Sequence, residues 1–152
     1  MRAWSRTPPR ICPCVKVSAI RYLIDAGPLV AALSARDQWH GWAIQTMAVI
    51  DEPVATSELA LAEACHLLKS ERPGLRQIAR FVATGRLRPL SPWDAAGRME
   101  ELLEKYPQMD ASDASLVTLS EKLPKAKIIT TDVRDFTVYR RFRNEPLPLI
   151  HP

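Results

Sequence analysis

The sequence predicts an α/β fold in which helices cover both faces of a central, mostly parallel sheet of four to five strands. Short apolar runs of strand length alternate with longer helical patterns along the whole chain. The hydrophobic content of 47% and the charged content of 25% are typical of a globular protein. A chain of 152 residues can bury one core, and no repeat or internal linker divides it.

The first half of the chain contains two expected strands and four expected helices. The first apolar run ends in Asp25-Ala26-Gly27-Pro28, a turn in which Pro28 suits the first position of a helix. Asp37 and Ser57 can each cap the helix that follows them. Pro73-Gly74 breaks the chain before a further helix. The expected strands are 19–25 and 54–56, and the expected helices are 28–33, 39–50, 58–69 and 75–84.

The second half continues the alternation. Residues 87–90 are a possible short strand, and Ser91 with Pro92 forms the cap and first turn of a helix over 93–105. Pro107 and Pro124 end two successive helices, the second of which is expected over 111–123. A strand over 127–131 follows. The last strand is expected in either of two places, 136–139 or 147–150.

The net charge of +4 comes from the N-terminus. Residues 1–20 carry four basic side chains and no acid, and the remaining 17 basic and 17 acidic side chains cancel. The charge therefore says little about nucleic-acid binding by the folded body. We expect residues 1–19 to be a flexible basic extension and residues 20–152 to be the folded domain.

Cysteine usage and hydropathy indicate where the protein works. Cys12, Cys14 and Cys65 are an odd and sparse set, which is typical of reduced thiols and a cytoplasmic protein. No apolar run approaches the roughly 20 residues that span a bilayer. We therefore expect no membrane association.

Two expected strands finish on an aspartate, Asp25 and Asp132. Aspartate is common in turns, so either residue alone has an ordinary structural explanation. In an open parallel sheet, however, the carboxyl ends of the strands lie at one edge, where ligands bind. The two aspartates together therefore mark a candidate site.

Two further acids lie on expected helices. Apolar residues surround Glu63 in sequence, so we expect its helix to be largely buried and its carboxylate to need a partner. A basic side chain that neutralises Glu63 is the alternative. Asp113 lies one turn inside its helix and is followed by an apolar ladder, so it should face the core side, whereas Asp110 can cap that helix.

Four acids gathered at one place would repel one another, and their pKa values would rise unless a cation joined them. Oxygen ligands favour a hard divalent metal, Mg²⁺ or Mn²⁺. Such a metal can activate water and stabilise charge on a phosphoryl group. The constellation of Asp25, Glu63, Asp113 and Asp132 therefore points to phosphodiester hydrolysis.

Four blocks of this sequence resemble the PIN-domain nucleases, and among them the VapC-like toxins of bacterial toxin–antitoxin pairs. The resemblance runs from about Arg21 to the C-terminus, and the order and spacing of the blocks carry it. The blocks are Tyr22-Leu23-Ile24-Asp25-Ala26-Gly27-Pro28-Leu29, Thr56-Ser57 with Glu63 six residues on, Met109-Asp110-Ala111-Ser112-Asp113-Ala114-Ser115-Leu116-Val117, and Thr130-Thr131-Asp132-Val133-Arg134-Asp135-Phe136.

The resemblance implies a PIN-like three-layer α/β/α fold and Mg²⁺- or Mn²⁺-dependent endoribonuclease activity. It implies a homodimer and an antitoxin partner that places a basic side chain into the acidic pocket. Val133 departs from the family, in which a polar or basic residue is frequent at this position. The implied metal and catalytic residues are Asp25, Glu63, Asp113 and Asp132, and the implied accessory residues are Asp110, Asp135, Thr130 and Thr131.

Basic side chains could contact an RNA substrate near these acids. Arg134, two residues after Asp132, is the candidate we retain, although a solvated surface position explains it equally well. Arg72, Arg76 and Arg80 form one helical row, which is more typical of a solvated face.

Two other functions stay open at this stage, and a third is disfavoured. The protein could be a PIN-type RNA-processing nuclease without an antitoxin, or a catalytically silent PIN-like binding module. A phosphatase of the haloacid dehalogenase type is disfavoured, because Asp25-Ala26-Gly27 lacks the second aspartate two residues after the first.

Overall fold

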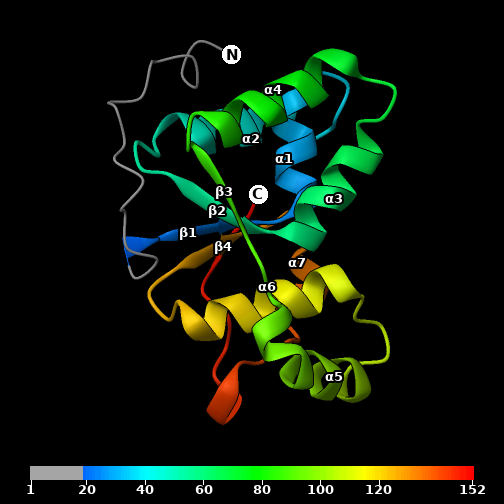
Figure 1. Ribbon diagram of the computed structural model, residues 1–152, viewed down its shortest axis with the longest axis vertical. Coiled ribbons are helices and arrows are strands. Elements are labelled where there is room, and N and C mark those ends of the chain that lie inside the picture. The colour runs from blue at the N-terminus through cyan, green and yellow to red at the C-terminus, as the bar shows by residue number, and fades with distance from the viewer. Residues whose placement is uncertain (1–18) are drawn as a thin grey trace.

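Five parallel strands form the centre of the protein. Figure 1 shows the computed structural model, which describes residues 19–152, so the expected extension at 1–19 lies almost wholly outside the described residues. The order across the sheet is β3-β2-β1-β4-β5, and every neighbouring pair is parallel. The strands are β1 (Tyr22–Ile24), β2 (Val54–Ser57), β3 (Leu87–Leu90), β4 (Lys127–Ile129) and β5 (Leu149–Ile150).

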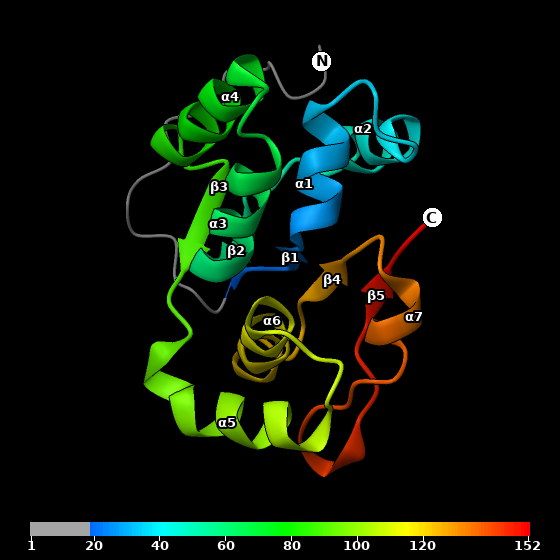
Figure 2. The same cartoon turned by 90° about the vertical axis from the view of Figure 1, so that its right-hand side faces the viewer.

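Helices cover both faces of this sheet, which confirms the predicted α/β/α architecture (Figures 1 and 2). One layer contains α1 (Ala26–Leu33), α2 (His40–Ala48) and α4 (Arg72–Ala83). The other contains α5 (Ala96–Lys105) and α6 (Ala111–Lys122). The helix α3 (Glu58–Leu67) contacts both α1 and α6. No helix within 19–152 is long and apolar enough to cross a bilayer.

Successive residues of the strands enter opposite cores, because side chains alternate across a sheet. Leu23 and Ile128 are fully buried in the core that contains residues of α5 and α6. Ile24 and Ile129 are fully buried in the core that contains residues of α1 and α4. Leu23 and Ile24, two adjacent residues of β1, therefore pack into the cores on opposite faces of the sheet.

Most expected elements are present, and some differ in their bounds. The helix expected from residue 75 begins at Arg72, with Pro73 in its first turn, where a missing N–H has no cost. Gly74 lies inside it, where a Cβ would meet the Leu68 side chain at 3.5 Å. The helix expected over 93–105 is a 3₁₀ turn, η2 (Trp93–Ala95), followed by α5.

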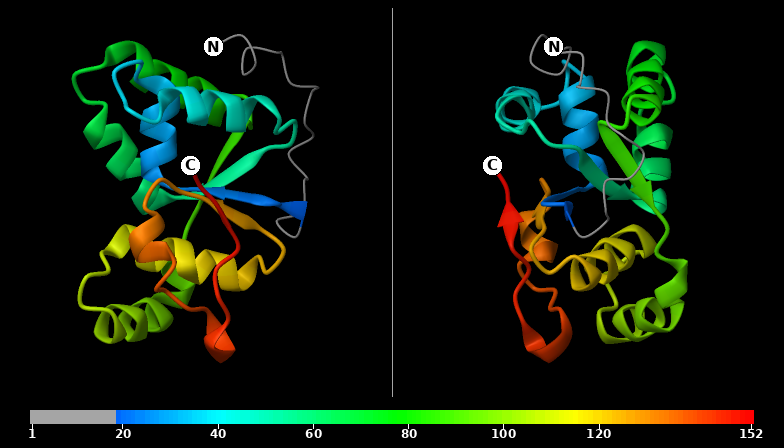
Figure 3. Two further views of the ribbon diagram at one scale, coloured as in Figure 1. Left: turned by 180° about the vertical axis from the view of Figure 1, so that it is seen from behind. Right: turned by 60° about the vertical axis from the view of Figure 1, so that its left-hand side comes forward.

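The last expected strand is β5, which lies within the second of its two alternatives. The first alternative, 136–139, was wrong, because the chain there ends the short helix α7 (Val133–Phe136). From α7 the chain passes through the 3₁₀ turn η3 (Phe142–Asn144) and returns along the sheet edge as β5 (Figure 3).

The strand order places a topological switch point between β1 and β4. The strands β2 and β3 extend the sheet to one side of β1, whereas β4 and β5 lie on the other side. In open parallel sheets, the crevice at the carboxyl ends of the two strands at such a point is where ligands bind. The residues that follow β1 and β4 are therefore those that the fold presents to a ligand.

Candidate functional site

Asp25 follows β1 and is the N-cap of α1. Its Oδ1 accepts a hydrogen bond from the Ala26 N–H at 2.7 Å, and its Oδ2 accepts one from the Thr130 hydroxyl at 2.9 Å. Its own N–H donates to the carbonyl of Ile129 at 2.9 Å, which extends the β1–β4 pairing. The helix begins at Ala26, so Pro28 occupies its third position, not the expected first. Hydrogen bonds thus hold both carboxylate oxygens and the backbone N–H of Asp25, which is 7% exposed.

Burial makes Asp25 hard to ionise and raises its pKa from 3.8 to about 6. The hydrogen bonds from Thr130 and Ala26 lower this pKa and so offset part of the effect of burial. The negative charges of Glu63 and Asp132 raise it further. Asp25 therefore lies within the electric field of two of the other three predicted acids.

Asp113 lies in the first turn of α6 and is half-buried, as its position before an apolar ladder predicted. Its N–H donates to the carboxylate of Asp110, which caps α6, at 2.8 Å. Its Oδ2 accepts a hydrogen bond from the Tyr139 hydroxyl at 2.8 Å. These two bonds anchor both the backbone and the side chain of Asp113.

The pKa of Asp113 is raised from 3.8 to about 7, first by burial and then by the charge of Asp110. The hydrogen bond from Tyr139 lowers it, and the charges of Asp25 and Asp132 raise it. Three aspartates from three separate stretches of sequence thus act on one another electrostatically, as the sequence analysis expected of a shared site.

Thr130 connects two of these aspartates. The Asp132 N–H donates to the Thr130 Oγ1 at 3.0 Å, and the same hydroxyl donates to Asp25. Asp132 itself is exposed and caps α7 by accepting a hydrogen bond from the Asp135 N–H at 3.1 Å. Thr130 therefore orients the predicted site, and it is fully buried.

Thr131 packs against the start of α1. A Cβ built on Gly27 would come 2.3 Å from the Thr131 Oγ1, closer than any real contact allows. Glycine at position 27 thus lets the loop after β4 approach the first turn of α1 and brings Asp132 toward Asp25.

Glu63 lies in a different environment from the one expected. The prediction that its helix is largely buried was wrong, because only Ala60 and Ala64 of α3 are buried. Leu67, one turn away, is 54% exposed, and Glu63 is exposed. Leu59, Leu61 and Cys65 of α3 pack against the two cores but are only partly buried, so continuous apolar sequence overstated burial here. Glu63 is nevertheless close enough to Asp25 to raise its pKa.

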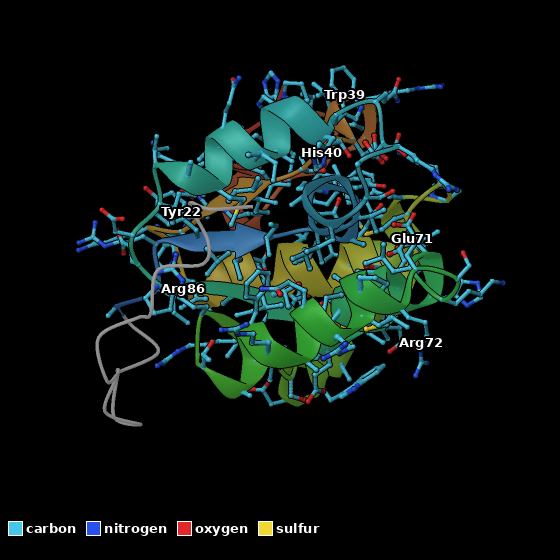
Figure 4. All side chains as sticks on the ribbon, turned by 90° about the horizontal axis from the view of Figure 1, so that it is seen from above. Tyr22, Trp39, His40, Glu71, Arg72 and Arg86 are labelled. Carbon is cyan, nitrogen blue, oxygen red and sulfur yellow. The ribbon has the colours of Figure 1, made fainter. Side chains whose placement is uncertain are left out.

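Two further predicted residues, Arg134 and Asp135, lie on α7, and the row of arginines lies on α4. Arg134 is exposed, and Asp135 is half-buried, with a charge that contributes to raising the pKa of Tyr139. The alternative row Arg72, Arg76 and Arg80 lies exposed along α4, whose start Figure 4 marks by Arg72. RNA contact by Arg134 remains a prediction.

Sequence reasoning missed Tyr139, whose hydroxyl donates to Asp113. The residue is fully buried, and burial raises its pKa, as does the hydrogen bond to Asp113. Its ring meets those of Tyr106 and Phe136 edge-on, at centroid distances of 5.2 and 5.5 Å. A contact that spans 26 residues leaves no local pattern in the sequence.

The chemistry of the four acids suits a hard divalent cation, but their side chains are not gathered around one point. Within residues 19–152, no ion pair joins Asp25, Glu63, Asp113 or Asp132 to a basic side chain, so the alternative of a neutralising cation for Glu63 is not seen there. The carboxylates are oxygen ligands of the kind that Mg²⁺ and Mn²⁺ prefer. As the side chains lie, no three Asp, Glu, His or Cys of the described region form a group that could hold an ion.

Comparison with known proteins gives matches in structure only. No family model matches the sequence, and no curated protein does. The sarcin–ricin-loop-cleaving toxin VapC20 of Mycobacterium tuberculosis is similar at a TM-score of 0.60 and 21% identity, over 66% of this chain and 82% of that one. A toxin–antitoxin complex from Klebsiella pneumoniae gives 0.61 and 20%, over 84% of this chain and 97% of that one.

A third solved structure extends the likeness. VapBC2 from Rickettsia felis, bound to a DNA fragment from its promoter, gives a TM-score of 0.61 and 16% identity, over 88% of this chain and 99% of that one. At such identities the comparisons establish the fold. The protein therefore has the PIN-like α/β/α fold of the VapC toxins.

Proposed function

We propose that this protein is a metal-dependent endoribonuclease that hydrolyses RNA phosphodiester bonds and acts as the toxin of a toxin–antitoxin pair. The pair Asp25 and Asp113 carries the proposal. Asp25 is buried, Asp113 is half-buried, both have raised pKa values, and the negative charge of Asp25 is one of the causes for Asp113. Asp25 follows β1 at the switch point of a fold that solved VapC toxins share.

Asp25, Glu63, Asp113 and Asp132 would hold Mg²⁺ or Mn²⁺ in this proposal. When bound, such an ion lowers the pKa of water and stabilises charge on a phosphoryl group. Thr130 keeps Asp25 oriented by donating to its Oδ2. The accessory acids would support the site, Asp110 from the N-cap of α6 and Asp135 from the first turn of α7, and Thr131 would support it from the loop after β4. The exposed guanidinium of Arg134 would contact an RNA phosphate.

The site can be tested by assaying purified protein on total RNA with Mg²⁺, with Mn²⁺ and with EDTA. We expect cleavage with either metal, none in EDTA, and a loss of roughly 100-fold or more in Asp25→Asn and in Asp113→Asn. The single amide oxygen of asparagine can still accept from Tyr139 at position 113, but at position 25 it can accept from only one of Thr130 and the Ala26 N–H, so circular dichroism must show that both variants are folded. Glu104→Gln, an exposed acid on α5, is the matched control and should retain full activity. Cleavage that persists in EDTA would refute the metal-dependent mechanism.

The toxin role needs a test of its own, because an RNA-processing nuclease would pass the cleavage assay. Expression of the wild-type chain should arrest bacterial growth, whereas Asp25→Asn should not. We propose an antitoxin partner, in keeping with the toxin–antitoxin complexes of the same fold. From the sequence resemblance alone, we propose that this antitoxin inserts a basic side chain among the acids and that the toxin is a homodimer. Cytoplasmic location is proposed from the sparse cysteines, of which Cys65 is a free thiol. Normal growth at high expression would favour RNA processing.

A further inference from the structure

We propose that Tyr139 is a positioning residue of this site, whose hydroxyl holds the Asp113 carboxylate in one orientation so that it can bind a divalent cation together with Asp25. The inference rests on the proposed function and deepens it. It starts from the hydrogen bond between the Tyr139 hydroxyl and the Asp113 Oδ2, at 2.8 Å.

The ring of Tyr139 cannot move easily. It is among the largest fully buried side chains of the described residues and belongs to the core that includes Tyr106 and Phe136. Edge-on contacts with both rings fix its plane. A hydroxyl on such a ring has a defined position, so its bond to Asp113 selects one rotamer of a side chain that is only half-buried.

The bond occupies only one oxygen of Asp113. Oδ2 accepts from Tyr139, and no described residue donates a hydrogen bond to Oδ1. Asp25 differs, because Thr130 and the Ala26 N–H take one oxygen each. Asp113 is therefore a half-buried carboxylate with one oxygen that no donor among residues 19–152 occupies.

A hydroxyl suits this position better than a basic side chain would. Tyr139 stabilises the ionised carboxylate through a hydrogen bond without adding positive charge. A lysine or arginine there would neutralise Asp113 and repel a cation. The same logic applies to Thr130 beside Asp25, and both hydroxyls come from one stretch, Thr130–Tyr139, which contains α7.

Tyr106 provides a matched control. It lies in the same aromatic cluster and is 8% exposed, but its hydroxyl makes no hydrogen bond with a described residue. If Tyr139 served only to fill the core, Tyr139→Phe and Tyr106→Phe would have similar effects. If it positions Asp113, only Tyr139→Phe should change cation binding.

The test is calorimetric titration of Mn²⁺ alone into the full chain, without RNA. We expect Tyr139→Phe to weaken Mn²⁺ binding by about ten-fold, as is typical of residues that orient a metal ligand, and Tyr106→Phe to change it less than about two-fold. In cleavage assays, Tyr139→Phe should need about ten-fold more Mn²⁺ for half-maximal rate, with an unchanged KM for RNA. Circular dichroism checks the fold, and Tyr139→Met replaces the phenylalanine variant if that one does not fold.

Two failures are distinguishable. If wild type binds Mn²⁺ and cleaves RNA but Tyr139→Phe matches Tyr106→Phe, the role of Tyr139 is refuted while the proposed function stands. If wild type neither binds Mn²⁺ nor cleaves RNA, the proposed function falls, and this inference falls with it.

Discussion

Asp25 and Asp113 carry negative charge at positions where burial makes ionisation unfavourable. Burial raises the pKa of Asp25 to about 6 and that of Asp113 to about 7. An acid whose pKa is higher in the folded than in the unfolded protein adds to the free energy of unfolding at pH values below its unfolded pKa. This contribution is lost as the pH rises through its folded pKa. For Asp113 that window runs from about pH 4 to about pH 7. The protein thus keeps an ionised site at neutral pH at the expense of its own stability.

Asp113→Asn should therefore make the metal-free protein more stable at about pH 8, and the gain should vanish toward pH 4. Asparagine carries no charge, so the variant does not lose the roughly 2 kcal/mol in the free energy of unfolding that wild type loses as Asp113 ionises. Urea denaturation in EDTA at about pH 4, 6 and 8 measures this difference between variant and wild type. Glu104→Gln, which also removes one acid but from an exposed position on α5, is the control. Parallel pH profiles for Asp113→Asn and wild type would contradict the expectation.

Four helices have their N-termini close to the candidate site. The helices α1, α6 and α7 are capped by Asp25, Asp110 and Asp132, and α3, which carries Glu63, is capped by Ser57. The N-terminus of a helix favours negative charge, so these starts partly offset the repulsion among the acids. The Ser115 hydroxyl donates to that of Ser57 at 2.6 Å and ties α6 to the start of α3.

Close packing between α1 and the loop after β4 can be measured with a double-mutant cycle. Gly27→Ala places a Cβ against the Thr131 Oγ1, so it should cost about 1–2 kcal/mol more in wild type than in the Thr131→Ala background. Thermal and urea unfolding of the four proteins measure this coupling. Gly97→Ala in α5, which meets nothing within 4 Å, should stabilise both backgrounds by up to about 1 kcal/mol. Additive effects of Gly27→Ala and Thr131→Ala would refute the close approach.

Local sequence signals predicted the elements well and their packing less well. Asp25 was identifiable as a strand end and Ser57 as a cap, because both signals depend on neighbours in sequence. The start of α4 was missed because Pro73-Gly74 usually breaks helices, yet proline is tolerated in a first turn. The exposure of Glu63 and the bond from Tyr139 depend on which helices meet in space, which no local pattern records.

The strand order of the whole sheet explains why acids distant in sequence influence one another electrostatically. Consecutive strands extend the sheet in one direction until β3, and the chain then returns to place β4 beside β1. That return brings the residues after Ile24 and Ile129 to the same edge of the sheet, where Asp25 and Thr130 make their hydrogen bond across 105 positions of sequence. The site is thus a consequence of topology, and cation binding to it should act on the entire fold.

Mg²⁺ or Mn²⁺ should accordingly raise the melting temperature, and by more at about pH 8 than at about pH 5.5. A cation that binds the folded state alone stabilises it by about 2.7 kcal/mol at 100 times its Kd, or roughly 5–10 °C. At about pH 5.5 both Asp25 and Asp113 are largely protonated, so the cation must displace protons and the shift should fall by more than half.

Differential scanning fluorimetry at matched ionic strength separates this effect from general screening of charge. Asp25→Asn and Asp113→Asn should each lose most of the shift, whereas Asp94→Asn, an exposed acid paired with Lys122, should keep it. A shift of the same size at both pH values, or one that survives in Asp25→Asn, would place the bound cation elsewhere on the surface. The pH dependence thus tests whether the two buried carboxylates, rather than the exposed Glu63 and Asp132, dominate cation binding.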